Sequence, residues 1–239
     1  TLATVHHAEQ VIGPVRQTAW SAVTEVDADF RRHQVSGEPI QLAEQVRTLR
    51  GVDMGRFSLS DNGVLVFSEG KVNQQLLLTD RAGQKLRTVG PLGGYGSPRF
   101  SPDEQRVAVG QLDPQSRSLD IHLLDLARGR DTRFTFDPAD DNYPLWSPDG
   151  KHIFFGSNRE GFLAIWQKGV NGNDGKEESV FKEDSRFIFQ SDWSNDGNYL
   201  VYWKNGEKTA SDLWLLPLSG DRQPKPYLTT QFNEAWGKV

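Results

Sequence analysis

Short apolar segments alternate with polar turns along most of this chain, and the alternation repeats at a nearly fixed period. The pattern is clearest where a large aromatic residue is followed by a turn similar to Ser-Pro-Asp-Gly. Four such segments begin at Phe57, Phe100, Trp146 and Trp193, with their aromatic residues 43, 46 and 47 residues apart. Self-similarity at a period of about 40–50 residues predicts a repeat architecture.

Each repeat predicts four short strands in the same order. An apolar strand rich in β-branched and aromatic residues follows the turn, and a second apolar strand comes next. A polar, Gly-containing turn then precedes a more variable last strand. The expected first strands are 64–67, 107–109, 153–155 and 200–202, and the second are 76–78, 121–124, 164–166 and 213–216. The last strands are expected at 85–89, 132–136, 178–182 and 225–229.

The aspartate of each turn is interpreted as a turn former. In Ser-Pro-Asp-Gly the proline presets φ, the aspartate bonds back to the backbone, and the glycine accepts a positive φ. These residues are Asp61, Asp103, Asp149 and Asp196. A ring of carboxylates that binds a ligand is the alternative, but recurrence in every repeat is what a structural role predicts.

Four short strands in about 45 residues make one blade of a β-propeller. One small twisted sheet cannot bury both faces alone, whereas blades stacked around an axis bury them all. We therefore predict an all-β propeller with four full four-stranded blades, at about 51–93, 94–139, 140–186 and 187–239. Residues 1–50 would form a partial blade or extension. A β-sandwich with coincidental spacing is the alternative.

The first 35 residues match the repeat poorly, and two interpretations compete. Pro14 could open an amphipathic helix that carries apolar residues as far as Phe30 on one face. Alternatively, residues 4–5 and 22–26 are strands of a degraded blade, with 41–46 as its outer strand, and we favour this interpretation. A fifth turn would begin at Val239, so we expect the chain to be a piece of a larger propeller.

Several motifs carry a family resemblance. The Ser-Pro-Asp-Gly turns, with Asp120–Asp125 and Ser211–Leu216, resemble TolB-like and WD-repeat-like propellers. The order of further segments resembles the C-terminal propeller of bacterial transmembrane serine/threonine kinases over roughly residues 35–239. Those segments are Gly37–Glu44, Phe57–Leu65, Ser157–Gly161 and Leu213–Leu218. The resemblance implies a periplasmic or extracytoplasmic interaction domain, in a parent protein that could be membrane-anchored.

Composition limits the function classes. Apolar residues make up 36% of the chain, and no apolar run is long enough to span a membrane, so this segment is not expected to insert in one. The formal net charge of −5, without a Lys/Arg cluster, argues against nucleic acid as a partner. With no cysteine, disulfides, thiol catalysis and Cys-ligated zinc are excluded. No cofactor is expected.

Catalytic and metal-binding patterns are also missing from the sequence. The Gly-x-Ser-x-Gly pattern of serine hydrolases is absent, and so are the Gly-rich loop and the His-Arg-Asp and Asp-Phe-Gly motifs of kinases. Two adjacent histidines, His6 and His7, and the isolated His33, His122 and His152 form no ligand cluster. We therefore expect no catalytic residues and no metal site, and we interpret the chain as a non-enzyme.

The best ligand-binding candidates lie just before the leading aromatic residue of each repeat. In a propeller this connection enters the innermost strand and lines one mouth of the central channel, and such variable loops are where binding residues concentrate. The candidates are Tyr95, Asp140, Asp141, Asn142, Tyr143, Arg186, Asn233 and Glu234. The two tyrosines could equally pack between blades.

Three functions remain open, and none of them names the ligand. The first is the sensor or interaction domain of a receptor-like kinase, which binds a protein or small molecule. The second is a TolB-like periplasmic module that works in protein assembly. The third is the propeller of a serine peptidase whose hydrolase domain lies elsewhere. Open blade edges would also allow self-association.

Overall fold

Every regular element that the computed structural model describes is a β-strand. The residues described are 4–7, 18–26, 33–44, 48–49, 52–55, 57–59, 65–69, 74–80, 82–171, 176–183, 188–194, 196–205, 211–232, 234 and 237. The chain divides into two compact units, Thr1–Tyr95 and Gly96–Val239, which are called the first and second unit below.

The first unit opens with an antiparallel sheet of three strands in the order β1-β2-β3. These are β1 (Thr4–His7), β2 (Thr18–Val26) and β3 (His33–Glu44). The strand interpretation of the N-terminal segment is therefore confirmed, and the alternative of a helix opened by Pro14 is wrong, because its centre lies in β2. The predicted strand 41–46 is the end of the longer β3. A short pair, β4 (Thr48–Leu49) and β5 (Val52–Gly55), follows.

The rest of the first unit follows the order of one predicted repeat. The strands are β6 (Phe57–Leu59), β7 (Leu65–Glu69), β8 (Gln74–Thr79) and β9 (Lys85–Phe100), paired antiparallel in sequence order. Val66, Leu76, Leu78 and Val89 are buried on these strands. We predicted a last strand ending at Val89 and a separate connection through residue 95, but β9 runs without a break to Phe100.

The second unit contains two complete four-stranded sheets and, before them in the chain, a sheet that begins on β9. After β9, this earlier sheet contains β10 (Arg106–Leu112), β11 (Leu119–Asp125) and β12 (Asp131–Arg133). The first complete sheet, called the third blade, is β13 (Asp141–Trp146), β14 (His152–Ser157), β15 (Ala164–Gly169) and β16 (Glu177–Phe181). The fourth blade is β17 (Ile188–Trp193), β18 (Tyr199–Lys204), β19 (Asp212–Pro217) and β20 (Lys225–Leu228). In each of these two blades the strands pair in sequence order.

One predicted strand is shorter in the structure. The last strand of the second repeat was expected at 132–136, but β12 ends at Arg133. The amides of Phe134 and Thr135 both donate to the carbonyl of Ile121, and the hydroxyl of Thr135 accepts from the amide of Ile121. This side-chain bond replaces a regular ladder bond, so the backbone leaves the sheet three residues earlier than predicted.

The turns that open the repeats share one hydrogen-bond pattern. In each, a serine hydroxyl donates to Oδ1 of the aspartate two residues later, at 2.5, 2.7 and 2.6 Å for Asp103, Asp149 and Asp196. The same Oδ1 also accepts a backbone amide beyond the turn. The serine hydroxyl accepts the amide of the residue five positions on. The aspartate thus fixes the loop before the apolar strand begins; Asp61 lies outside the described residues.

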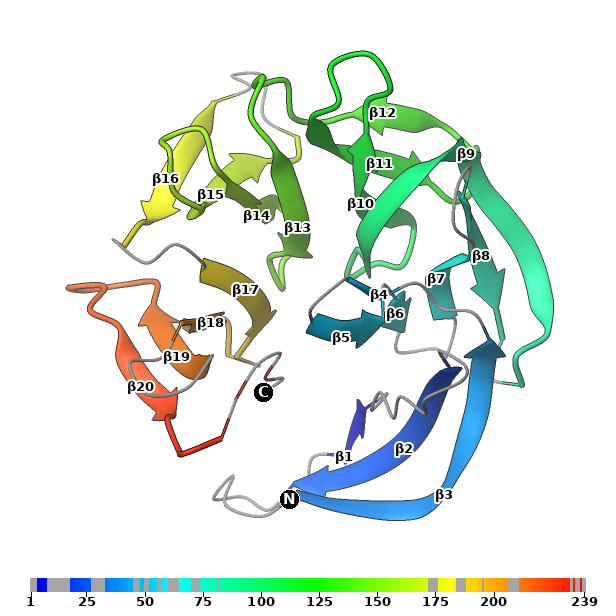
Figure 1. Ribbon diagram of the computed structural model, residues 1–239, viewed down its shortest axis with the longest axis horizontal. Coiled ribbons are helices and arrows are strands. Elements are labelled where there is room, and N and C mark those ends of the chain that lie inside the picture. The colour runs from blue at the N-terminus through cyan, green and yellow to red at the C-terminus, as the bar shows by residue number, and fades with distance from the viewer. Residues whose placement is uncertain are drawn as a thin grey trace. The chain divides into compact units, whose positions relative to one another are not determined.

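Consecutive sheets of the second unit pack through their apolar faces. Trp146, Ile153 and Phe155 of the third blade pack with Ala108 and Ile121 of the sheet before it. On its other face, the third blade packs against Ile188, Leu200, Tyr202 and Leu216 of the fourth blade. In Figure 1, β13 lies between β10 on one side and β17 on the other, and it is in contact with both strands. The third blade therefore buries both of its faces by stacking.

Hydrogen bonds also join the innermost strands of consecutive blades. Trp146 Nε1 donates to the carbonyl of Arg99 at 3.2 Å, and Gln190 Nε2 donates to the carbonyl of Tyr143. The two partners are 47 residues apart in both cases. The two bonds use different positions of the repeat, since Trp146 is the leading aromatic residue of its repeat and Gln190 lies three residues before Trp193.

Candidate functional site

A cleft of about 620 Å³ opens in the second unit beside the start of β13. Its lining is mostly apolar or aromatic, with a few amide and carboxylate groups, which is the usual composition of a ligand site. The lining residues are Leu119, Asp140, Asn142, Tyr143, Gly156, Asn158, Gly161, Phe162, Leu163 and Phe189. They come from β11, β13, β14, β17 and the loop 158–163 that joins β14 to β15.

Asp140 forms the polar edge of the cleft. Its Oδ1 accepts the amide of Leu119 at 2.9 Å, and its own amide donates to Asn158 Oδ1 at 3.0 Å. The amide of Asn158 in turn donates to the carbonyl of Asp140. Asp140 thereby joins three segments of backbone and remains an exposed carboxylate.

Tyr143 lies at a bulge in β13, where the pairing with β14 shifts between Asn142 and Leu145. Its φ is +57°, a left-handed conformation that is rare for a bulky side chain. Asn142 Oδ1 accepts a hydrogen bond from the amide of Tyr143 at 2.8 Å, and Gln190 Nε2 donates a hydrogen bond to the carbonyl of Tyr143. These two bonds hold the unusual backbone, which turns the residue toward the fourth blade.

Aromatic rings continue from Tyr143 into the fourth blade. Tyr143 meets Phe189 edge-on with ring centroids 4.8 Å apart, and Phe189 stacks on Trp203 at 4.4 Å. Such pairs add about 0.5–1.5 kcal/mol beyond the burial of their area. One wall of the cleft is therefore a rigid aromatic surface that two blades build together.

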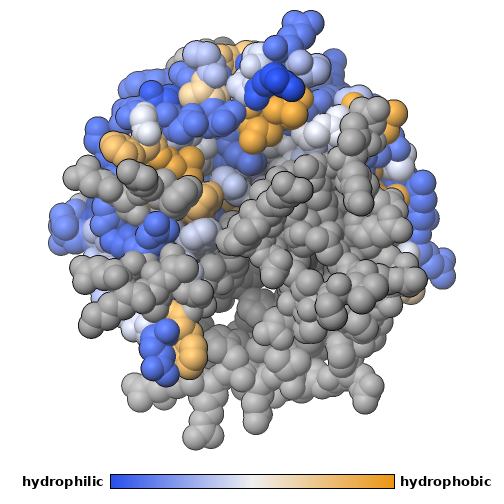
Figure 2. Space-filling view, viewed as in Figure 1, coloured by the Kyte–Doolittle hydropathy of each residue, from blue (hydrophilic) through white to orange (hydrophobic). Residues whose placement is uncertain are grey.

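The loop 158–163 forms another part of the lining, and its phenylalanine, Phe162, is exposed. Phe162 lies in the short loop between β14 and β15 and is 51% exposed. Leu163 next to it is partly covered and faces Gly156. Figure 2 shows that apolar side chains on the visible face gather in small patches among hydrophilic ones.

A buried group of charges holds this loop from below. Arg159 Nη2 contacts both carboxylate oxygens of Asp141 at 3.0 Å, and its Nη1 contacts Glu177 at 2.5 Å. Lys168 binds Glu177 at 3.1 Å and the carbonyl of Phe134 at 2.7 Å. The Arg159 guanidinium also lies 4.4 Å from the centre of the Trp166 ring. The loop is therefore anchored to three strands.

Burial and pairing act on these groups in opposite directions. Asp141 is fully buried, and this desolvation raises the pKa of its carboxyl against the opposing effect of hydrogen bonds from Ser157 and Arg159. Burial acts to lower the pKa of Arg159, but hydrogen bonds to Glu177 and Asp141 outweigh it, and the pKa is raised. Because these charged side chains form ion pairs with one another, we interpret them as holding the loop in place and not as binding a ligand.

The structure distributes the eight predicted binding residues over three situations. Asp140, Asn142 and Tyr143 meet at the cleft. Tyr95 is fully buried and donates its hydroxyl to the carbonyl of Pro91 at 2.6 Å, while Asp141 belongs to the buried charges. Glu234 is buried and binds the backbone and hydroxyl of Thr230. Arg186 and Asn233 lie outside the described residues.

Most of the cleft lining, seven of its ten residues, was not anticipated from the sequence. Phe162, Leu163 and Phe189 line it, together with Leu119 at the start of β11. The signal that could have found the loop is Gly161-Phe-Leu163, two apolar residues inside a segment that otherwise reads as a polar turn. Leu119 carries no such signal, because apolar residues are expected at the start of a strand.

The described residues were also searched for metal ligands and for membrane spans. No group of three or more His, Asp or Glu side chains among them could hold a metal ion. Of the isolated histidines, His122 lies on β11 and its Nδ1 is 2.7 Å from Asp131 Oδ1. Within the same part of the chain, no helix has the length and apolar character needed to cross a bilayer.

Comparison with known proteins decides the family. The family model for the TolB β-propeller domain, PD40, matches residues 56–234, which is more than half of the chain. The chain belongs to the TolB β-propeller family. The predicted all-β propeller fold is thereby confirmed, together with the TolB-like part of the resemblance; membership of the kinase-associated group is not shown.

Solved TolB structures have the same fold. A protein of Agrobacterium tumefaciens assigned as TolB superposes with a TM-score of 0.63 at 18% identity, over 87% of this chain and 76% of that one. TolB from Acinetobacter baumannii superposes with a TM-score of 0.62 at 16% identity, over 100% of this chain and 60% of that one. At these identities the likeness concerns the fold alone.

A curated relative matches over a shorter stretch. The uncharacterized protein Atu1656 of Agrobacterium fabrum is 39% identical over 74 residues, which are 31% of this chain and 25% of that protein. The chain therefore spans about a quarter of the length of this relative. The match adds a sequence relationship to that protein without assigning an activity.

Proposed function

We propose that the chain is a non-catalytic, extracytoplasmic protein-binding module of the TolB type, and that the cleft beside β13 is its binding site. The observation that carries this proposal is the cleft itself. Its aromatic wall of Tyr143 and Phe189 is rigid, and another part of its lining presents Phe162 to solvent. Aromatic anchors with a polar edge are the composition of protein-binding surfaces.

The chemistry of the lining supports binding over catalysis. Acid–base or nucleophilic catalysis needs a nucleophile within hydrogen-bond reach of a base. The described residues that line the cleft include no histidine, serine, threonine or lysine, and Asp140 is the one carboxylate among them. That carboxylate already accepts the amide of Leu119. The lining therefore offers contacts and hydrogen bonds to a partner, without a pair of groups suited to move a proton.

The family match supports the TolB-like interpretation over that of a kinase sensor. The matched model spans the strands that build the cleft, from β11 to β17, and it is a TolB domain. Two TolB structures share the fold. We accordingly place the module outside the cytoplasm as part of the same proposal, with a protein rather than a small molecule as its partner.

Site-specific photo-crosslinking tests the proposal. A photoreactive phenylalanine analogue replaces Phe162 in one variant and Phe232 in the other. Phe232 is 67% exposed in the same unit but does not line the cleft, so it is the matched control. We expect position 162 to yield a discrete cross-linked protein from a periplasmic extract, and position 232 to yield none. Identical products from both positions, or none from position 162, would contradict the proposal.

A further inference from the structure

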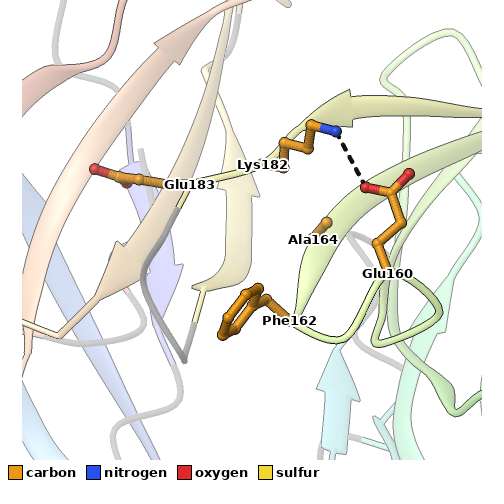
Figure 3. Close-up of a pocket in the computed structure, with 5 residues that line it drawn as sticks. All are labelled: Glu160, Phe162, Ala164, Lys182 and Glu183. Atoms are coloured by element: carbon orange, nitrogen blue, oxygen red, sulfur yellow. Dashed lines mark hydrogen bonds and ion pairs between the residues drawn. The ribbon is translucent and has the colours of Figure 1, made fainter.

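A second cavity, of about 520 Å³, adjoins the cleft in the second unit. It is lined by Glu160, Phe162, Ala164, Lys182 and Glu183. Phe162 lines both cavities, and the two together are called the groove below. Figure 3 shows the Phe162 ring projecting into the open space below Ala164, with the Glu160–Lys182 pair on one side and Glu183 on the other.

The two compartments of this groove differ in chemistry. The compartment at β13 has Leu119, Leu163, Tyr143 and Phe189 in its wall and holds one carboxylate, Asp140. The compartment at Lys182 is bounded by two carboxylates and one ammonium group. One end of the groove therefore suits an apolar side chain, and the other end suits a charged one.

The expected sign of the partner's charge follows from how the charged groups that line the groove are paired. Among the described residues that line the groove, Lys182 is the only cation, and it binds Glu160 at 3.3 Å, while Glu183 pairs with Lys204, which is not one of these lining residues. Both side chains of the Lys182–Glu160 pair are exposed, at 70% and 41%, and such surface pairs contribute about 0–1 kcal/mol. An incoming cation can therefore exchange with Lys182 at little cost. Asp140 adds a second exposed carboxylate, so the groove attracts positive charge.

Phe162 supplies a further reason for a cation at this place. Its ring is exposed and lines both compartments, and the face of an aromatic ring attracts an ammonium or guanidinium group within about 6 Å. A side chain that reaches past the ring toward Glu160 would meet both the π-face and the carboxylate. Arginine and lysine have the length and charge for this contact.

We propose that the groove binds an extended segment of the partner protein that carries an aliphatic or aromatic side chain and, close by, a lysine or arginine. The apolar side chain enters the compartment of Leu119, Leu163 and Phe189, and the cation lies between Phe162 and Glu160. This inference rests on the proposed function, because it names the chemistry of the protein that the cleft would take.

Selection from a library of random heptapeptides displayed on phage tests the proposal with the complete chain as bait. We expect enriched sequences to combine a large apolar residue with lysine or arginine, and to be depleted of acidic residues. A labelled consensus peptide is then titrated against the protein, with fluorescence anisotropy as the readout. Absence of enrichment, or enrichment of acidic sequences, would overturn the proposal.

Four variants locate the bound peptide. Phe162→Ala should weaken binding at least tenfold, and Phe232→Ala should leave it unchanged. The isosteric pair Asp140→Asn and Glu160→Gln should together weaken binding about tenfold and flatten its dependence on salt. Glu178→Gln, which removes an exposed carboxylate that does not line the groove, is the control for net charge. Equal losses in test and control variants would place the peptide elsewhere.

The outcome can be separated from that of the proposed function. If crosslinking from position 162 captures a protein but the selected peptides are acidic or bind without Phe162, the cleft is a binding site for a different chemistry. If crosslinking fails while basic apolar peptides bind in the groove, the chemistry of the groove is correct and the proposed function is wrong.

Discussion

Gly110 and Asn142 lie so close together that a Cβ atom on Gly110 would be 2.2 Å from Asn142 Oδ1. Gly110 belongs to β10, and Asn142 belongs to the innermost strand of the next sheet. The same Oδ1 accepts the amide of Tyr143 and thus helps hold its positive φ. The cleft therefore depends on a glycine that is not itself part of the lining.

Gly110→Ala should lower the free energy of unfolding by roughly 1–3 kcal/mol, the usual cost of overpacking. Asn142 can retreat only by giving up its bond to Tyr143, so binding at the cleft should also weaken. Urea unfolding and peptide titration measure the two effects. Gly156→Ala is the control for stability only, since its Cβ would meet Leu163 Cδ1 at an ordinary 3.4 Å but Gly156 lines the cleft. A stability equal to that of the control would refute the close contact.

Glu104→Gly should stabilise the second unit by about 1 kcal/mol. Glu104 has a φ of +56°, and the residues at the same position of the next two turns are Gly150 and Gly197, with φ of +67° and +70°. A left-handed conformation costs a residue with a side chain roughly 1–2 kcal/mol, which glycine avoids. Thermal melting measures the gain. Gly150→Ala should move the melting temperature the opposite way, and a lower melting temperature for Glu104→Gly would disprove the argument.

The turn aspartates should make the fold sensitive to acid. Hydrogen bonds from Ser101, Ser147 and Ser194 lower the pKa of the aspartates at positions 103, 149 and 196. As the pH falls, the unfolded chain therefore binds protons before the folded protein does. The contribution of these turns to stability is present above the ordinary aspartate pKa of about 3.9 and is lost as the pH falls through the lowered values.

Urea unfolding between pH 6 and pH 2 tests this dependence. Asn keeps the Oδ1 acceptor but cannot be protonated in this range, so it preserves the bonds of the turn. The triple variant Asp103→Asn, Asp149→Asn, Asp196→Asn should lose less stability below about pH 4 than the wild-type protein. Parallel curves for the two proteins would show that other groups cause the acid sensitivity.

The charges under the loop 158–163 should be costly to break. Arg159→Met would leave Asp141 and Glu177 buried without their main partner, which costs about 3–5 kcal/mol. Arg128→Met removes the exposed pair with Asp125 and should change stability by less than about 0.5 kcal/mol. Chemical unfolding measures the change in the free energy of unfolding for both variants. If Arg159→Met were as mild as Arg128→Met, the buried ion pairs would have no anchoring role.

The repeats made most of the strands predictable, because turn chemistry and apolar runs are local. The segments 153–155 and 200–202 were recognised from their apolar residues alone, and both lie inside observed strands. The ends of strands were less predictable. Thr135 ends β12 through a hydrogen bond to Ile121, a partner 14 residues away that periodicity cannot reveal.

The site was predictable only in part, since a cleft is made by residues distant in sequence. The position before Trp146 identified Asp140, Asn142 and Tyr143, because that connection has a known place in a blade. The sequence could not distinguish Asp140 from Asp141, although their side chains lie in different environments. Asp140 is exposed at the cleft, and Asp141 is buried against Arg159. Adjacent residues of a strand point to opposite faces, and here the two faces differ in polarity.

The two hydrogen bonds between innermost strands, Trp146 to Arg99 and Gln190 to Tyr143, span the same 47 residues. Each interface within the second unit thus joins a blade to the one directly before it. Duplication or loss of one whole blade would recreate an interface of the same kind instead of exposing a new one. Chains of this family can therefore change their length in steps of one blade during evolution, while an insertion of part of a blade would leave an apolar face without its partner.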